Sequence, residues 1–400
     1  MVRGLAAYRS ILLPRGAWRF SLAGWLSRLY RVGTVVSVIV LLTGTGESFA
    51  LSGAAAGAII VGAAIGGPLW ARWADRSGQS VVAWTAAAAA LVIATGYTLL
   101  VAVGAPAPLL VVGAGVVGLS GANGDALVRS RWMHLLKSRE ERHRALALES
   151  ALDELGFLVG LPVLTTIASF LPYAGLVTAA GLGAVGFVGL ALLRATAPAP
   201  RTLRAEAEEA ERRRGWRAWL PVGVAPVIPI FLAVGAIFGF INLMGVAVSE
   251  AVGMPGLSGA VIGAFSIGAV VAGLAWGVLS GRIPPSRRLV VAGLLFAVLT
   301  PLLALATDPL GFGVIAAVVG LGLTPLMISS MATIEERTPM HSITVAMAWP
   351  SVALAAGNAS ASAVVGLAIE SVGLGGLWGV PIVIAALVLV GVGAAVASRR

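Results

Sequence analysis

Residues 80–124 decide the fold: they read SVVAWTAAAAALVIATGYTLLVAVGAPAPLLVVGAGVVGLSGANG and contain no charged residue. A helix that crosses the hydrocarbon core of a bilayer needs about 20 apolar residues, so this run is long enough for two such helices. It is interrupted at Ala105-Pro-Ala-Pro108, where the prolines favour a turn. The run therefore predicts two transmembrane helices joined by a tight connection.

The same pattern extends over the rest of the chain. Of the 400 residues, 58% are hydrophobic and 11% are charged, whereas soluble domains contain roughly 25% charged residues. The apolar runs are continuous rather than alternating, which favours helices over a barrel. We expect an all-α membrane protein of twelve transmembrane helices, in two six-helix bundles related by pseudo-two-fold symmetry. The spans are expected near residues 20–43, 49–71, 80–104, 107–128, 145–171, 173–193, 222–249, 255–280, 287–306, 309–333, 341–369 and 374–397.

The basic residues support this count. Every lysine and arginine falls in the terminal segments, in the 2–3, 4–5, 6–7, 8–9 and 10–11 connections, or in the helix ends beside them. The opposite connections contain Glu47, Glu250, Asp308 and Glu370 and no basic residue. Basic residues concentrate on the cytoplasmic side of membrane proteins. We therefore expect a multi-pass protein of the bacterial cytoplasmic membrane, with both termini cytoplasmic. The net charge of +10 then reflects orientation in the lipid bilayer, and no nucleic-acid partner is expected.

One long polar segment divides the chain. Residues 195–217 contain charges of both signs and two prolines, which is typical of a solvated linker. We expect an N-terminal six-helix bundle at 1–194, a cytoplasmic linker at 195–217 and a C-terminal six-helix bundle at 218–400.

The two halves also share short charged segments. Residues 71–78 between the second and third spans resemble residues 277–284 between the eighth and ninth. Residues 140–142 before the fifth span (EER) recur as 335–337 before the eleventh. Repeated halves with a binding site between them are how alternating-access carriers are built.

These features resemble the major facilitator superfamily, whose signature between helices 2 and 3 is Gly, three residues, Asp, Arg, one residue, Gly and a basic residue. Here Asp75, Arg76 and Gly78 match, whereas Ala71 and Gln79 replace the outer positions. The chain is also similar to actinobacterial members described as exporters. The resemblance implies that this loop latches the two halves on the cytoplasmic side in the outward-open state. Gly78 would permit a turn with positive φ, and Asp75 would cap a helix or pair with an arginine, for which Arg129 and Arg131 are the candidates.

The fifth span contains Gly156, Gly160 and Pro162. It resembles the glycine–proline motif of superfamily antiporters, although there the proline follows the glycine directly. The glycines, four residues apart, would let another helix approach closely, and the proline would bend the helix. Ordinary tight packing is the alternative interpretation. The arginine that proton–drug antiporters carry early in helix 4 is absent from residues 109–120.

Several ionisable residues lie within predicted spans, where they usually mark a pathway, a proton relay or a paired lock. We expect the arginines of the first span to pair with carboxylates of the fourth and fifth. Three roles are open: a permanent structural lock, a proton carrier at Asp153 or Glu154, and direct substrate contact. The residues are Arg28, Arg31, Asp125, Glu149, Asp153 and Glu154.

The C-terminal half carries mainly neutral polar groups within its spans. By resemblance, helices 1, 4, 7 and 10 surround the central cavity, which makes Arg31 and several neutral residues candidates for its lining. Packing between helices is the alternative for each one. The uncharged candidates on these helices are Asn123, Phe238, Asn242 and Ser330. Asn358 of the eleventh span is a further candidate.

The leading functional hypothesis is a secondary active transporter that moves a small, partly apolar organic solute by alternating access, as proton-coupled efflux. Its expected partners are the solute, and protons or another coupling ion, and a monomer is expected to be sufficient. Without cysteine and with three scattered histidines, no metal site, cofactor or catalytic residue is expected. The alternatives are uptake or facilitated movement of a small polar solute, a non-transporting membrane sensor or assembly protein with a carrier fold, and an enzyme acting on lipid-linked substrates.

Overall fold

The computed structural model describes Leu12 and residues 16–200, 224–279, 283, 285–306, 308–338 and 346–398. Within these residues, twelve helical segments are long and apolar enough to cross a membrane, and no strand occurs. The predicted all-α class and the number of spans are confirmed. Residues 201–217, which make up most of the expected linker, and residues 341–345, the expected start of the eleventh span, lie outside the described residues.

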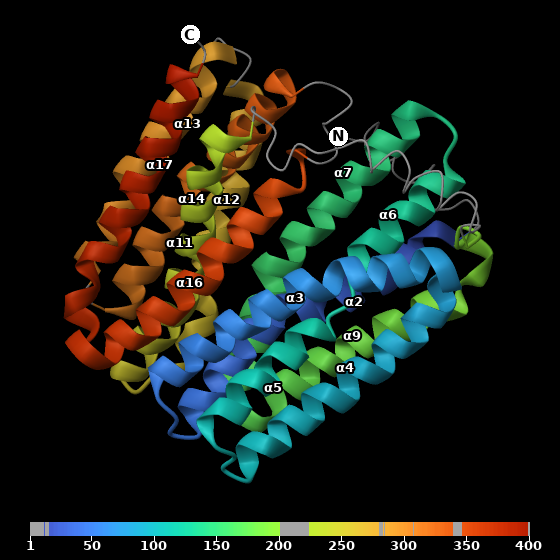
Figure 1. Cartoon of the computed structure of the whole chain (residues 1–400), viewed down its shortest axis with the longest axis horizontal. Coiled ribbons are helices and arrows are strands. Elements are labelled where there is room, and N and C mark those ends of the chain that lie inside the picture. The colour runs from blue at the N-terminus through green and yellow to red at the C-terminus, as the bar shows by residue number, and fades with distance from the viewer. Residues whose placement is uncertain are drawn as a thin grey trace.

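Six spans form the first half of the chain, coloured blue to green in Figure 1. They are α2 (Ala17–Gly44), α3 (Phe49–Ser77), α4 (Gln79–Ala102), α5 (Ala107–Leu119) with α6 (Gly124–Leu135), α7 (Arg139–Leu155) with the π-helix η2 (Gly156–Gly160) and α8 (Leu161–Phe170), and α9 (Pro172–Leu192), followed by the short 3₁₀ turn η3 (Arg194–Thr196).

Six spans form the second half, coloured yellow to red in Figure 1. They are η4 (Ala225–Val227) with α11 (Ile228–Ala251), η5 (Pro255–Leu257) with α12 (Ser258–Leu279), α13 (Pro285–Leu299) with η7 (Thr300–Leu305), α14 (Pro309–Arg337), α16 (Trp349–Val372), and η8 (Leu374–Trp378) with α17 (Gly379–Ala397).

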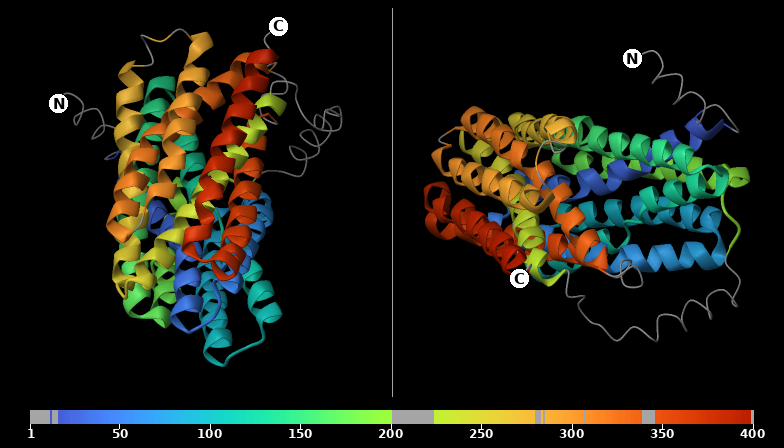
Figure 2. Two further views of the ribbon diagram at one scale, coloured as in Figure 1. Left: turned by 90° about the vertical axis from the view of Figure 1, so that its left-hand side faces the viewer. Right: turned by 90° about the horizontal axis from the view of Figure 1, so that it is seen from above.

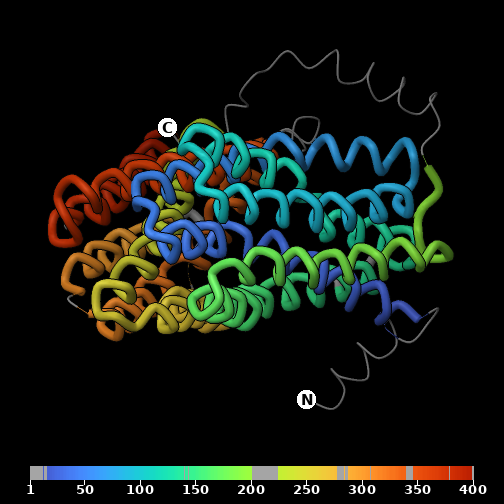
Figure 3. The backbone as a smooth tube through the Cα atoms, turned by 90° about the horizontal axis from the view of Figure 1, so that it is seen from below, coloured from blue at the N-terminus to red at the C-terminus, as the bar shows by residue number. Residues whose placement is uncertain are grey.

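The helices of each half pack mainly against one another, in the same pattern. In the first half α2 packs on α9, α3 on α5 and α4 on α9; in the second, α11 packs on α17, α12 on α14 and α13 on α17. The contacts between the halves are repeated as well, since α3 packs on α16 and α12 packs on α8. Figures 2 and 3 show the two groups side by side when the molecule is viewed from above and below. Spans two and eight, and spans five and eleven, therefore occupy equivalent places.

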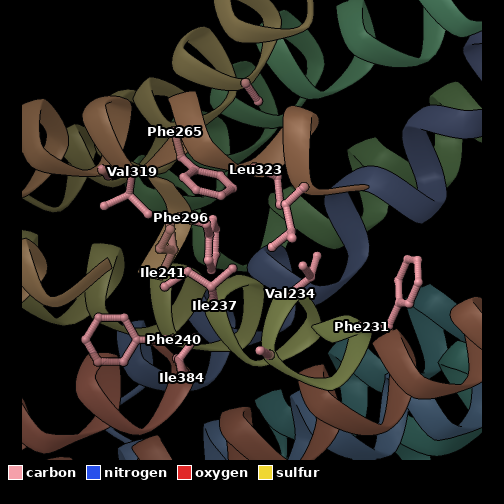
Figure 4. Close-up of a cluster of buried hydrophobic side chains, with 14 of the residues drawn as sticks. Phe231, Val234, Ile237, Phe240, Ile241, Phe265, Phe296, Val319, Leu323 and Ile384 are labelled. Carbon is pink, nitrogen blue, oxygen red and sulfur yellow. The ribbon is translucent and has the colours of Figure 1, made fainter. Parts of the chain in front are cut away.

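The second half has a continuous apolar core centred on α11, because this helix is hydrophobic on all sides. Figure 4 shows side chains of α11 meeting those of α12, α13, α14 and α17. Phe240 packs against Phe312 with ring centroids 6.3 Å apart. Phe238, also on α11, stands edge-on to Phe265 of α12 at 5.7 Å. This core holds in place the side of the second half that faces the first half.

Two predicted spans are broken rather than continuous. The fourth span, expected as one helix over 107–128, is divided by residues 120–123 into α5 and α6. Side chains form hydrogen bonds with backbone groups on both sides of the break. Asn123 caps α6 by accepting from the Ala126 N–H at 3.3 Å, and the Trp70 indole donates to the Leu119 carbonyl at 2.9 Å. Because residues 120–123 carry no charge, their composition did not reveal the interruption.

The fifth span contains the π-helix η2 between α7 and α8. Gly156 and Gly160 bound this segment, and the Leu161 N–H bonds to the Gly156 carbonyl. Pro162, which has no N–H to donate, is the second residue of α8. The structure therefore has a π-helical turn directly before the proline at which the sequence predicted a bend, and such turns often accompany functional sites.

The molecule has two chemically distinct ends. We call the end where α2 begins at Ala17 and α17 ends at Ala397 the basic end, because the arginine-containing connections lie there. We call the opposite end, which contains Glu47, Glu250, Asp308 and Glu370, the acidic end.

Candidate functional site

Two adjoining cavities lie between the halves and share Arg31, Val35, Leu354 and Asn358. The small lobe has a volume of about 230 Å³ and the large lobe about 660 Å³. Ligand sites for small molecules usually enclose about 300–1,000 Å³. The shared residues come from α2 and α16, so both halves contribute to one central space.

The small lobe is largely apolar. Its walls carry three phenylalanines, Phe157 from η2, Phe238 from α11 and Phe265 from α12. A few polar groups interrupt this surface, namely Arg31, Asn242, Ser266 and Asn358. A partly apolar molecule with one or two polar groups suits this lining.

The large lobe extends toward the basic end. It follows α3 from Ile59 to Ala71, which is about 18 Å at 1.5 Å per residue. Its opposite wall is the beginning of α16, from Ser351 to Asn358, together with Ala348. The central space therefore reaches from the middle of the molecule toward its basic end.

At the acidic end the halves touch directly. The Thr43 hydroxyl of α2 donates to Glu250 of α11 at 2.5 Å. The Ala50 N–H at the start of α3 donates to Glu370 of α16 at 2.9 Å. These are hydrogen bonds between groups about 200 and 320 residues apart in sequence, and they close the acidic end of the central space.

Glycines bring the helices of this closure into backbone contact. A methyl group on Gly53 of α3 would lie 2.2 Å from the Ser362 carbonyl oxygen of α16, and one on Gly366 would lie 2.4 Å from the Phe49 carbonyl oxygen. On the other side, a methyl group on Gly259 of α12 would lie 2.4 Å from the carbonyl oxygen of Pro162. Only glycine permits such close helix packing. We call these two helix contacts, α3 with α16 and α12 with α8, the glycine seal.

A cluster of five charged side chains ties three spans of the first half together near the basic end. Arg28 of α2 contacts Asp125 of α6 at 3.3 Å, Asp153 of α7 at 2.8 Å, and Glu149 of α7. Arg129 of α6 pairs with Asp125 at 2.7 Å and with Asp153 at 3.0 Å. Two cations thus face three carboxylates, and we call this group the charge cluster.

The centre of the charge cluster is inaccessible to solvent. Glu149 is 0% exposed and Arg28 is 3% exposed. Glu149 also accepts hydrogen bonds from the Ser21 hydroxyl and the Trp132 indole, both at 2.7 Å. Nearly every polar atom there is satisfied; the Arg28 Nε–H is the exception. Such saturation is what allows buried charges to be retained.

The two arginines of the first span have different surroundings, contrary to the expectation that both pair with carboxylates. Arg28 forms the predicted ion pairs, whereas Arg31 is exposed to the central cavities. Among the described residues, Arg31 has no hydrogen bond or ion pair. Residues three apart on a helix differ by about 60° around its axis, which is enough to turn Arg31 away from the cluster.

The neighbouring carboxylates of the fifth span are separated in the same way. Asp153 is 27% exposed and bridges Arg28 and Arg129. Glu154 is exposed and has no partner within the part of the chain that the structure describes. One residue of helix rotates the side chain by about 100°, so Asp153 faces the charge cluster and Glu154 does not.

The expected pairing of Asp75 with Arg129 or Arg131 is not formed. Arg129 belongs to the charge cluster, and Arg131 is fully buried. Arg131 donates to Gln79 at 2.8 Å, to the Leu190 carbonyl at 2.7 Å, and to the Leu193 carbonyl and the Thr196 hydroxyl. It thereby joins α4, α6 and α9 within one half. Gly78 has the predicted positive φ, at 88°, and separates α3 from α4; Asp75 and Arg76 lie in the last turns of α3.

Most candidates for the cavity lining are where the resemblance implies. Phe238 and Asn242 line the small lobe, Asn123 lines the large lobe, and Asn358 lines both. Ser330 does not: it is fully buried and lines neither lobe. Its position on α14 faces the core of the second half instead of the central space.

The glycine seal was missed in the sequence, although a signal for it exists. Gly53 and Gly57 are four residues apart in the second span, and Gly259 and Gly263 have the same spacing in the eighth. This spacing is typical of closely packed transmembrane helices. In the structure Gly263 packs on the Pro162 ring, where a methyl group would come within 2.5 Å, and Gly160 packs on Leu29. The predicted packing roles of Gly160 and Pro162 thus involve different partners.

Comparisons with known proteins agree with this architecture. The family model of the Major Facilitator Superfamily matches residues 20–362. No curated protein matches the sequence. Among solved structures, a variant of the nucleoside transporter NupG superposes with a TM-score of 0.70 at 13% identity, covering 96% of this chain and 100% of that chain. A peptide transporter POT variant gives 0.68 at 16% identity over 96% and 95% of the two chains. A D-xylose–proton symporter gives 0.67 at 15% identity over 95% and 96%.

The structural superpositions show the fold, and the family match over residues 20–362 shows the family. The chain therefore belongs to the Major Facilitator Superfamily, and it is a membrane transporter rather than an enzyme.

Proposed function

We propose that this transporter exports a small, partly apolar organic molecule across the bacterial cytoplasmic membrane in exchange for protons. The observation that carries the proposal is the central space, which is closed at the acidic end by contacts between halves and extends toward the basic end. By the positive-inside rule the basic end faces the cytoplasm. The site would then be reached from the cytoplasm, where an exported molecule binds and an imported one is released.

The lining supports the nature of the solute. The small lobe offers aromatic and aliphatic walls with a few polar groups, which suits a compact molecule with an apolar body. A sugar-binding site would be expected to contain more amide and aromatic side chains. The peptide, nucleoside and xylose carriers that share the fold leave the solute of this chain open, because identities of 13–16% carry only the fold.

Proton coupling would reside in Glu154. Its neighbour Asp153 is held by two arginines and belongs to the charge cluster, so it acts as part of a structural lock. Glu154 is exposed and unpaired among the described residues, which leaves it free to gain and lose a proton during transport. Glu154 lies three residues before Phe157, which lines the small lobe, and outside the ion-pair network. A carboxylate in such a position is the simplest place for an exchangeable proton.

The test uses the purified chain in proteoliposomes and a panel of labelled small organic solutes. The wild type should move at least one solute against its gradient when an opposing proton gradient is imposed. The Glu154→Gln variant should keep counterflow of that solute, which needs no proton, and lose the response to the proton gradient. The matched variant Asp153→Asn should keep the gradient response in the molecules that fold.

Two results would contradict the proposal. Counterflow without any effect of the proton gradient in the wild type would make the chain a facilitator. A Glu154→Gln variant with the wild-type gradient response would remove this residue from the coupling mechanism. Proton antiport and proton symport are distinguished by the sign of the proton gradient that accumulates the solute.

A further inference from the structure

Among the described residues, Arg31 is the only charged side chain that lines either lobe of the central space. It lies 14 residues after Ala17 and 13 before Gly44 in α2, which places it about 20 Å from both ends of the helix at 1.5 Å per residue. A cation at the middle of a transmembrane helix costs several kcal/mol unless it is paired or hydrated. An arginine without an ion-pair partner at the middle of α2 therefore needs a functional explanation.

No described carboxylate of the protein compensates this charge. The carboxylates of the charge cluster, Asp125, Glu149 and Asp153, are engaged by Arg28 and Arg129. Glu154 forms no ion pair with Arg31. Arg31 has no hydrogen-bond or ion-pair partner among the described residues, while its side chain faces both lobes. The positive charge is therefore presented to whatever occupies the cavity.

The surroundings of Arg31 complete a site for an amphipathic molecule. Asn358 from the other half lines both lobes, and Asn242 lines the small lobe. Within the described part of the chain, Asn242 forms no hydrogen bond, and Asn358 contacts only Ser362 at 3.4 Å. Phe238 and Phe265, set edge to face, provide an apolar wall. The site thus combines the positive charge of Arg31, the hydrogen-bonding amides of the two asparagines and the aromatic surface of the two phenylalanines.

We infer that the transported solute is a small organic anion, whose carboxylate or comparable acidic group binds Arg31 while its apolar body lies against Phe238 and Phe265. The guanidinium group presents parallel N–H donors that match a carboxylate in a bidentate arrangement. The inference rests on the proposed transport function for its biological meaning. The binding site itself is testable without transport.

The test measures binding to the detergent-solubilised full chain. The probes are small aromatic and branched aliphatic monocarboxylates, each compared with its own primary amide and with the amine of similar shape. Binding is followed by the shift in thermal unfolding temperature at millimolar ligand. Some carboxylates should stabilise the wild type, and their amides and amines should not.

The variants assign the effect to the guanidinium. Arg31→Met should weaken carboxylate binding about 10- to 100-fold, the effect of losing a charge-assisted hydrogen-bond pair. Arg31→Lys should weaken it about tenfold, because it keeps the charge and loses the planar fork. The control is Arg144→Met, which removes an arginine that pairs with Glu140 on the surface and should leave binding unchanged.

Three results would overturn the inference: equal stabilisation by amides, preferential stabilisation by amines, or no stabilisation by any carboxylate. Carboxylate binding that survives in Arg31→Met would overturn it too. The outcomes separate from those of the proposed function. Carboxylate binding without transport would reject the proposed transport function and retain the binding site. Transport of neutral or cationic solutes by Arg31→Met at the wild-type rate would retain the transport function and reject the carboxylate site at Arg31.

Discussion

Replacing Gly259 with alanine is expected to stop transport while leaving the protein folded. The added methyl group would lie 2.4 Å from the Pro162 carbonyl oxygen, a backbone atom that cannot rotate away. Overpacking of this kind costs about 1–3 kcal/mol, and here the cost falls only on the conformation in which the acidic end is closed. The population of that conformation should fall about 5- to 150-fold. Gly53→Ala should act in the same way through the Ser362 carbonyl oxygen.

Solute counterflow in proteoliposomes measures the loss of transport, and thermal unfolding in detergent measures folding. Gly181→Ala is the matched control, because a methyl group at this glycine of α9 would have no atom within 4 Å. A Gly259→Ala variant with wild-type counterflow would show that the glycine seal does not need to close during transport. Equal loss in the Gly181 control would point to a general defect of the helices.

Substituting Arg28 with methionine is expected to have the largest effect on stability. Arg28 contacts three carboxylates in the charge cluster, and Glu149 at its centre is 0% exposed. Removing one partner from a buried ion pair typically costs about 3–5 kcal/mol, because the remaining charge is left without compensation. We expect a marked fall in the yield of folded protein and in the thermal unfolding temperature.

Arg31→Met provides the control, since Arg31 lies only one turn away but has no described partner. It should fold with an unfolding temperature no lower than that of the wild type and lose function instead. A double variant, Arg28→Met with Glu149→Gln, should recover part of the stability because one uncompensated charge is removed with the arginine. Equal stability of Arg28→Met and the wild type would mean that the charge cluster is not a structural lock.

The sequence was sufficient for the global fold because two independent patterns agreed. Apolar runs of membrane-spanning length gave the twelve helices, and the arginines, confined to alternate connections, verified the count. Both patterns reflect the cost of placing charged groups in hydrocarbon. The predicted number of spans and the all-α class were therefore confirmed, and no tertiary contact was needed to find them.

Local departures from regular helix could not be predicted in this way. The interruption between α5 and α6 at residues 120–123 is uncharged, so it does not change the hydropathy on which the spans were placed. The π-helix before Pro162 depends on how the fifth span packs against α2 and α12. The sequence predicted a bend at this proline but not a π-helix before it.

The sequence identified most residues of the candidate site but not the role of each one. Arg28 and Arg31 looked equivalent, since both belong to the first span, but about 60° of helix rotation separates a saturated ion-pair network from an open cavity. The same reasoning applies to Asp153 and Glu154. Ser330 was assigned to the cavity through the helix that carries it, although its side chain faces the core. Rotational position is set by packing between distant segments, which a single sequence does not display.

The central claim is that the cavity opens alternately at the two ends, and distances between spin labels test it most directly. The chain has no cysteine, so labelled pairs can be introduced without removing native thiols. One pair, Val103→Cys with Leu310→Cys, spans the two halves at the acidic end; the other, Ser77→Cys with Ala397→Cys, spans them at the basic end.

The pairs should be measured in proteoliposomes, with and without a transported solute, at two pH values. The account predicts that conditions which lengthen the acidic-end distance shorten the basic-end distance, so that the two populations exchange in opposite directions. If both distances lengthen together, or if neither changes under any condition that supports transport, then alternating access between these halves is contradicted.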